Sequence, residues 1–453
     1  MKSTDRFRWA LRSPVFIATI ALALRLLYLW TPPSRMRVGS VDGLGLGYEA
    51  IRIAQSIVLG RGYSSPFQAE SGPTAWVPPA LPFLLAADFK LFGMHSRAAL
   101  VSILVLNEIF SAATCIPIFF ASKIISGTGA RAAWLWAFYP YALLVPFYAA
   151  RWYMSLSALL AACILFATLW ILRSDRSSQW TGYGLLWGFE LITNASFASI
   201  APFLLVWLAL RLRAACRGWI RLSGLAAAAL VLVCAPWTIR NYAVFHTWVP
   251  LRPNFGFELW RFNNPAGPLH PTGDPSELAL YVRLGETAYN REKKTEAFRL
   301  IRAHPGTFVV ATAHRIKEFW GGAESDSAST MVKWVGHWRS RALLATNLGL
   351  IVLTMAGLSF AWFRKREVFC PLFLFPLIFP LVYYITVSET AYRYPIDPIL
   401  IVLAALGTEW IIPVESGGGA ESGSPGREGL QSHPQRHGTA IGAASRLSQL
   451  LAP

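Results

Sequence analysis

Long apolar stretches dominate the chain, and polar residues collect between them. Each stretch is continuously apolar rather than alternating, and most approach the roughly twenty residues that a helix needs to cross a bilayer core. The pattern therefore predicts about ten transmembrane helices. We place them at residues 14–30, 98–120, 132–147, 153–172, the two halves of 182–212, 222–237, 343–363, 369–387 and 398–412.

The stretch from Gly182 to Leu212 is too long for one helix, and the polar sequence TNAS lies in its middle. We therefore split it near Asn194. Charge supports the split, because a single helix would move the basic cluster between Arg211 and Arg221 to the outer side and reverse every later segment.

The outer connections have helical patterns of their own. Residues 48–60 place Ile51, Ala54, Ile57 and Val58 on one face, which predicts an amphipathic helix at the membrane interface. Residues 78–93 predict a second helix that is too short to span the bilayer.

In the large outer connection, Asp274 is a predicted N-cap, Pro275 takes the first helical position, and Glu277 stands where a capping box places its acid. We expect a helix from there toward Arg302 and another over residues 305–320 that leads back to the membrane.

The predicted fold is thus an all-α polytopic membrane protein with both termini in the cytoplasm. Its first outer loop contains amphipathic helices, and a small helical domain follows later on the same side. The expected parts are a cytoplasmic N-terminus (1–13), transmembrane helices 1–7 (14–236) with the first outer loop (32–97), a periplasmic helical domain (237–342), transmembrane helices 8–10 (343–412) and a disordered Gly- and Ser-rich tail (413–453).

Composition agrees with this picture. Over 453 residues, 54% are apolar and only 14% charged, too few to cover a soluble protein of that size. The net charge of +17 would suit a nucleic-acid binder, but the basic residues lie in every second short connection, as the positive-inside rule requires. We therefore predict no nucleic-acid partner. The five cysteines lack paired spacing, so no disulfide framework or zinc site is predicted.

Asp42 and Glu49 in the first outer loop are the candidate general bases, because a carboxylate on one side of the membrane can accept the proton of an incoming hydroxyl. For Glu49 the alternative is capping, since an acid at a helix start favours the helix dipole. Arg240 and Arg393 stand at the outer ends of predicted helices and are candidate phosphate ligands. Their alternative role is interfacial anchoring. Tyr392, beside Arg393, is a further candidate for binding the phosphate-bearing ligand.

Glu108 and Glu190 lie at membrane depth, where an ionisable residue suggests function by default. We interpret them as structural polar contacts, with Arg25 as the partner that neutralises Glu108.

Four segments together resemble the GT-C superfamily of membrane glycosyltransferases, in particular bacterial proteins similar to the dolichyl-phosphate-mannose protein mannosyltransferases of glycosyltransferase family 39. They are GYEAIRIAQSIVLGRGYSSPF, GPTAWVPPALPFLLAADFKLFG, APWTIRNYAVFHTWVPLRPNFGFELWRFNNP and TAYRYPIDPILIVLAALG. Many members have adjacent Asp and Glu residues early in the first outer loop, whereas Asp42 and Glu49 are separated here, so the choice between them stays open.

The resemblance implies an enzyme of the bacterial inner membrane that transfers a sugar, with inversion, from a polyprenyl phosphate to a glycan, lipid or protein hydroxyl on the outer face. It implies Glu49 or Asp42 as base. From the chemistry of their side chains, we expect Trp76 to stack on a sugar ring and Asn254 and Glu258 to bind its hydroxyls. No cofactor is predicted, and a divalent metal requirement is left open. The alternatives are a flippase of lipid-linked saccharides, although the halves show no matching broken helices, and an inactive lipid-binding member.

Overall fold

The computed structural model describes residues 11–29, 48–68, 70–94, 96–144, 153–215, 218–265, 267, 269–321, 337–388 and 390–411. Asp42 and the tail after residue 412 lie outside these ranges. The regular elements of the described residues are helices, accompanied by an isolated β-bridge between Ser64 and Pro73, and the all-α prediction is confirmed.

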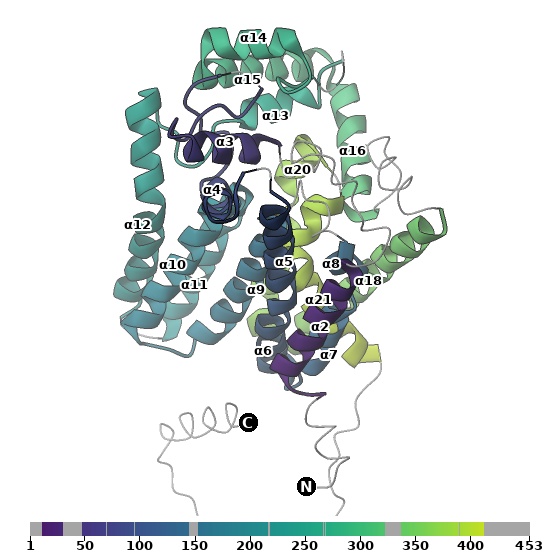
Figure 1. Ribbon diagram of the computed structural model, residues 1–453. Helices are drawn as coiled ribbons and strands as arrows, with labels where there is room; N and C mark the ends of the chain where they lie inside the picture. The colour runs from purple at the N-terminus through teal and green to yellow at the C-terminus, as the bar shows by residue number, and fades with distance from the viewer. Residues whose placement is uncertain are drawn as a thin grey trace, which may run out of the picture. The chain divides into compact units, whose positions relative to one another are not determined.

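One group of helices forms a bundle (Figure 1). Its members are α2 (Pro14–Leu29), α5 (Arg97–Ala113), α6 (Cys115–Ser126), α7 (Ala130–Ala137), α8 (Pro140–Leu144), α9 (Tyr153–Ile171), α10 (Ser177–Thr193), η5 (Ala195–Ser199), α11 (Ala201–Ala215), α12 (Trp219–Phe245), α18 (His337–Arg364), α19 (Arg366–Ile378), α20 (Leu381–Ile385), η6 (Thr390–Ile396) and α21 (Asp397–Ile411).

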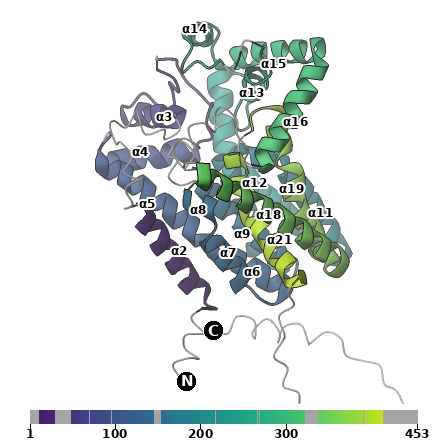
Figure 2. The same cartoon turned by 90° about the vertical axis from the view of Figure 1, so that its right-hand side faces the viewer.

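A second group lies at one end of the bundle in both views (Figures 1 and 2). It contains α13 (Phe255–Arg261), α14 (Pro275–Leu284), α15 (Glu286–Ala303) and α16 (Pro305–Gly321), with α3 (Tyr48–Val58) and α4 (Ala80–Phe92) between α13–α15 and the bundle. We call α13–α16 the outer helices.

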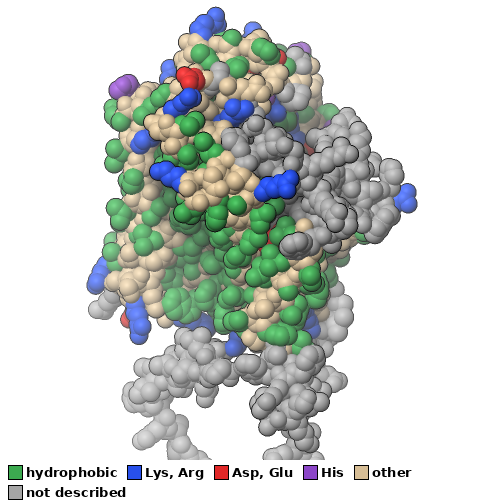
Figure 3. Space-filling model, viewed as in Figure 1, with side chains coloured by type: hydrophobic (Ala, Val, Ile, Leu, Met, Phe, Trp, Pro, Cys, Tyr) green, Lys and Arg blue, Asp and Glu red, His purple; other side chains and the backbone are tan. Residues whose placement is uncertain are grey.

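Within the described residues, five helices are long and apolar enough to cross a membrane: Arg97–Ser126, Met154–Ile171, Trp219–Phe245, Arg341–Arg364 and Arg366–Ile385. The other predicted spans fall on shorter helices. Hydrophobic side chains cover much of the bundle surface seen in Figure 3, and residues such as Leu232 and Val352 are more than 60% exposed. So large an apolar surface requires lipid as its solvent.

Two predicted boundaries illustrate how polar and cyclic residues break the apolar segments. The split near Asn194 is confirmed, because the Asn194 side chain accepts the Ser196 N–H and replaces the helical pattern with a short 3₁₀ turn. The predicted helix over 132–147 instead ends at Ala137, and α8 begins at Pro140, which has no N–H to continue the hydrogen-bond ladder.

Close packing between bundle helices depends on small residues. A Cβ added at Gly357 of α18 would lie 1.9 Å from the carbonyl oxygen of Leu403 in α21, and one at Gly184 of α10 would lie 2.0 Å from that of Ala226 in α12. At these two positions the backbones of neighbouring helices approach each other as closely as they do at the small-residue contacts typical of membrane helices.

Arg25 does not make the predicted ion pair with Glu108. Its buried guanidinium donates to Ser111 Oγ at 2.9 Å and to backbone carbonyls of α2 and α7. Both carboxylate oxygens of Glu108 are buried without a hydrogen-bond partner among the described residues.

The outer helices follow the predicted pattern with two corrections. Asp274 caps α14 by accepting the N–H groups of Ser276 and Glu277 at 2.9 and 3.0 Å. The helix ends at Gly285, whose φ of +75° favours glycine, and α15 starts as a separate helix.

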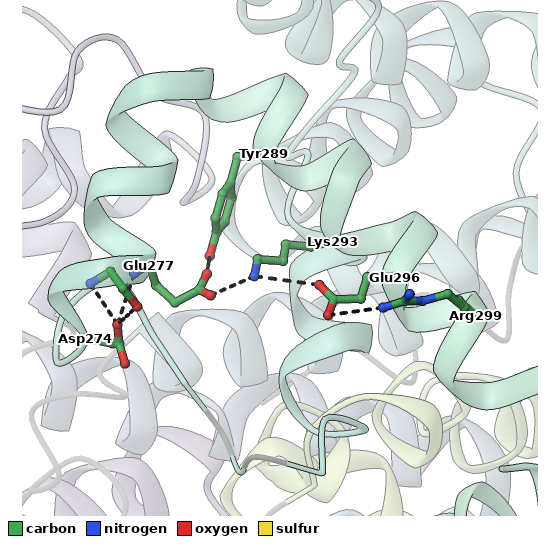
Figure 4. Close-up of polar contacts among 7 residues, drawn as sticks. Asp274, Glu277, Tyr289, Lys293, Glu296 and Arg299 are labelled. Atoms are coloured by element: carbon green, nitrogen blue, oxygen red, sulfur yellow. Dashed lines mark hydrogen bonds and ion pairs between the residues drawn. The ribbon is translucent and has the colours of Figure 1, made fainter. Parts of the chain in front are cut away.

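Glu277 does not complete a capping box. Its carboxylate accepts hydrogen bonds from Tyr289 and Lys293, both at 2.7 Å (Figure 4). Lys293 also lies over the Trp260 ring. The acid therefore joins α14 to α15.

Candidate active site

A cavity of about 560 Å³ lies between α3, the outer helices and the bundle. Its wall includes backbone and side chains of the helix break at Asn194, together with α20 and η6. Its polar lining residues are Glu49, Trp76, Thr193, Asn194, Ser196, Arg252, Asn254, Glu258, Arg261, His270, Tyr383, Thr386 and Tyr392. Five predicted site residues, Glu49, Trp76, Asn254, Glu258 and Tyr392, thus line a single space.

Glu49 reaches the cavity because α3 is amphipathic. Ala50, Ile51 and Ala54 are buried in a cluster with α4 and α5, which fixes the helix and turns its second residue toward the outer helices. The Glu49 Oε1 atom lies 3.3 Å from His270 Nε2, and 24% of its side chain is exposed.

His270 has a defined orientation. Its Nδ1 atom accepts the backbone N–H of Thr272 at 3.1 Å, so the proton of the neutral ring is on Nε2, the atom that faces Glu49. The rings of Phe67, Trp76 and Phe257 meet the imidazole edge-on at 5.3–6.2 Å between centroids. The ring is therefore held by packing as well as by hydrogen bonds.

This environment favours the ionised form of Glu49. Burial alone would raise its pKa, but the hydrogen bond from the His270 imidazole, with a smaller effect of Arg261, brings the pKa below its usual 4.5. Glu49 is thus a carboxylate, able to accept a proton, over the whole neutral range.

Glu258 on α13 is a second carboxyl group in the cavity, and its environment raises its pKa, whereas that of Glu49 is lowered. It accepts the Asn254 amide N–H at 3.2 Å and lies 3.9 Å from Arg252. Burial raises its pKa above 4.5, although Arg252, Arg261 and His270 oppose the shift. Two carboxyl groups whose pKa values are moved apart are typical of acid–base sites.

Arg252 and Arg261 line this cavity and are cationic, although neither was predicted from the sequence as a site residue. The Nε atom of each is buried and has no hydrogen-bond partner in the part of the chain that the structure describes. Such donors can bind an anion that enters the cavity. Their signal in the sequence was the segment LRPNFGFELWR, which places an arginine on either side of Glu258.

Arg240 is not in the cavity lining. Its guanidinium donates to the carbonyl oxygens of Thr74 and Tyr63 at 2.6 and 2.8 Å and lies over the rings of Tyr63 and Trp237. Its donors hold the first outer loop in place, so the structure does not bring it to the predicted phosphate site.

Arg393 is also absent from the lining. It is fully buried in the bundle, where it pairs with Asp397 at 2.7 Å and donates to Asn347, Tyr139 and the carbonyl of Trp320. Its neighbour Tyr392 does line the cavity. The predicted phosphate role of Arg393 thus has no geometric support, whereas Tyr392 remains a candidate contact.

Trp76 is positioned by a buried carboxylate, Glu286, which was not predicted from the sequence as a site residue. Glu286 of α15 accepts the Ala75 N–H at 2.7 Å and hydrogen bonds from Thr74 and Tyr281. Burial raises the pKa of Glu286 despite these three donors. The first outer loop is therefore held from α12 by Arg240 and from α15 by Glu286, with Trp76 in the cavity wall.

Gly256 allows α13 to approach α15, and we expect Gly256→Ala to disturb the site. The new Cβ would lie 2.3 Å from the carbonyl oxygen of Asn290, so the helix that bears Glu258 and Arg261 must move. Overpacking of this kind costs roughly 1–3 kcal/mol. Thermal unfolding in detergent measures it. Gly273→Ala, which meets nothing within 4 Å, is the matched control, and equal melting temperatures for both variants would contradict the argument.

Among the described residues, no group of three or more His, Cys, Asp or Glu side chains is arranged to hold a metal ion. Asp42 lies outside the described residues.

No protein-family model and no curated protein sequence matches this chain. Solved structures do match. The archaeal oligosaccharyltransferase AglB from Archaeoglobus fulgidus, in complex with an inhibitory peptide and a dolichol-phosphate, is 14% identical with a TM-score of 0.54, over 90% of this chain and 50% of that chain. The apo form of the Archaeoglobus fulgidus oligosaccharyltransferase is 15% identical with a TM-score of 0.55, over 89% of this chain and 50% of that chain.

This chain thus spans about half the length of these structures. The narrower resemblance to glycosyltransferase family 39 stays a prediction. The helices and their arrangement show that this chain shares its fold with the archaeal oligosaccharyltransferase over the region that the two have in common.

Proposed function

We propose that this chain is an inverting glycosyltransferase of the bacterial inner membrane, with both termini in the cytoplasm. It transfers a monosaccharide from a polyprenyl-phosphate donor to a hydroxyl group of a glycan, lipid or protein on the outer face. The observation that supports this most is the joint presence in one cavity of an ionised acid, Glu49, and two arginines with unpaired buried donors.

In the proposed reaction, the acceptor hydroxyl lies against Glu49 and gives its proton to the carboxylate. Its oxygen attacks the anomeric carbon from the side opposite the phosphate, and the bond between that carbon and the phosphate oxygen breaks. One displacement inverts the anomeric centre. General-base catalysis contributes about 10²–10⁴-fold to such a step.

His270 positions the base in this scheme. Its Nε2–H holds one oxygen of Glu49 and leaves the second for the acceptor. Trp76 offers its ring to the sugar, and Asn254 offers polar atoms to the sugar hydroxyls. Arg252 and Arg261 bind the phosphate and stabilise the charge that develops as it leaves.

The comparisons support a lipid phosphate as ligand in one respect. The AglB structure with this fold is a complex with an inhibitory peptide and a dolichol-phosphate. A polyprenyl phosphate has the same chemistry, an anionic head on a long isoprenoid chain that lies in the membrane.

Loss of either cavity arginine is expected to weaken donor binding. Arg252→Met and Arg261→Met each remove charged hydrogen bonds worth about 1.5–3 kcal/mol, which corresponds to roughly 10–100-fold in affinity. Binding of a polyprenyl phosphate to the purified protein in detergent measures this. Arg283→Met on the exposed side of α14 is the control, and unchanged affinity in both cavity variants would contradict the phosphate site.

The activity itself is tested in cells. We expect a deletion strain to accumulate a sugar-linked polyprenyl phosphate and to lack that sugar in one envelope glycan, lipid or protein. Wild-type lipid sugars together with wild-type glycans in the deletion strain would argue against the proposed function.

A further inference from the structure

The two carboxyl groups of the cavity differ in their partners. Glu49 on α3 accepts the Nε2–H of His270, whereas Glu258 on α13 accepts only the neutral amide of Asn254 among the hydrogen bonds of the described residues. The nearest cation to Glu258 is Arg252 at 3.9 Å, too far for a hydrogen bond. About a quarter of each side chain is exposed, so both can exchange protons with water.

Glu258 belongs to the part of the cavity where we propose that Arg252 and Arg261 bind the phosphate. It lies between Arg252 and Arg261 in sequence, and it lines the same cavity as both. An ionised carboxylate there would repel a phosphate and occupy the arginines that bind it. A protonated carboxyl group would instead donate to the phosphate.

Such a donor can stabilise the leaving phosphate. In the donor lipid the phosphate is a diester with one negative charge, and the break from the sugar leaves a monoester that gains a second charge. The second pKa of a phosphate monoester is about 6, so the departing oxygen can take a proton from an acid of similar pKa.

On this basis, and resting on the proposed function, we propose that Glu258 is the catalytic acid that gives its proton to the phosphate as the sugar leaves. The acceptor proton passes to Glu49, the new bond forms between the acceptor oxygen and the anomeric carbon, and the electron pair of the broken bond goes to the phosphate oxygen. That oxygen takes the proton of Glu258. Exchange with water then returns a proton to Glu258 and removes one from Glu49.

The charges that face Glu258 agree with this role. Burial and the Glu49 carboxylate raise its pKa, while Arg252, Arg261 and His270 lower it, with a net rise above 4.5. A bound phosphate adds negative charge beside it and raises the pKa further. Activity therefore requires ionised Glu49 and protonated Glu258, and it falls at low pH as Glu49 gains a proton and at higher pH as Glu258 loses one.

The test is Glu258→Gln in the full chain, assayed with a polyprenyl-phosphate sugar over a range of pH. Gln keeps a hydrogen-bond donor but has no proton to transfer. We expect kcat to fall about 10²–10⁴-fold, the donor KM to stay within about threefold of the wild type because binding is kept, and the decline at higher pH to disappear. Thermal unfolding and Glu258→Asp, which restores part of the rate, show that the fold is kept.

Two results would overturn the inference: a Gln variant with wild-type kcat and pH profile, or one in which only the donor KM rises, as a sugar-binding role predicts. Neither would affect the proposed function, which fails instead if the wild-type protein releases no polyprenyl phosphate from any donor.

Discussion

We expect Glu49→Gln to slow sugar transfer by about 10²–10⁴-fold, the usual contribution of a general base. The amide has nearly the shape of the carboxylate but cannot accept the acceptor proton at neutral pH. It can still take the hydrogen bond of His270 Nε2, so the local structure is retained. The initial rate with a polyprenyl-phosphate sugar in liposomes measures the effect.

The matched control is Glu70→Gln, which removes an acid of the same loop. The Glu70 side chain is 79% exposed and, within the described part of the chain, forms its ion pair with the exposed Arg61. We expect the control to keep the wild-type rate. Full activity in a well-folded Glu49→Gln protein would remove Glu49 from the role of base and return Asp42 to consideration.

The second large effect concerns stability. Arg393→Met is expected to lower the free energy of unfolding by about 3–5 kcal/mol, because it leaves the carboxylate of Asp397 buried without its cation. Among its side-chain partners in the described residues, Asp397 keeps the Tyr139 hydroxyl at 2.8 Å, and Asn347 loses its 2.7 Å donor. The network joins α18 and α21 to η6, so its loss weakens the packing of all three elements. Denaturant unfolding in detergent measures it.

An exposed ion pair of equal length provides the control. Arg61 and Glu70 are 2.8 Å apart but more than half exposed, and Arg61→Met should cost no more than about 1 kcal/mol. If Arg393→Met is as stable as this control and only donor binding is lost, the original assignment of Arg393 to the phosphate would be favoured over our structural one.

Much of the fold follows from hydrophobicity alone. The predicted apolar segments are helical, and α3, α4, α14 and α16 lie where amphipathic pattern and capping residues put them. The errors fall at single residues. The predicted helices over 132–147 and from Asp274 toward Arg302 are interrupted near Pro140 and at Gly285. Pro140 lacks an N–H and Gly285 has a positive φ, and the pattern of apolar and polar residues does not reveal such single-residue effects.

The site was harder to predict than the fold. Glu49 was selected from its position at the start of a helix in an outer loop, and the structure places it in the cavity. Arg240 and Arg393 were selected in the same way, yet they point to loop carbonyls and to Asp397. Sequence position fixes the depth of a residue in the membrane but not the direction of its side chain.

Arg252 and His270 line the cavity, but their sequence positions did not predict it. They enter the cavity from irregular segments before α13 and α14, whose course no periodic pattern encodes. Glu286 lies more than two hundred residues from Thr74, and only the packing of α15 against the first outer loop brings the two together.

The most direct test of the account is the fate of the donor lipid. Purified wild-type protein in liposomes, given a polyprenyl phosphate with a radiolabelled sugar and an acceptor extract, should release free polyprenyl phosphate while the label appears in the acceptor with inverted anomeric configuration. Transfer of the intact, uncleaved lipid-linked sugar from one leaflet to the other would contradict it and identify the chain as a flippase.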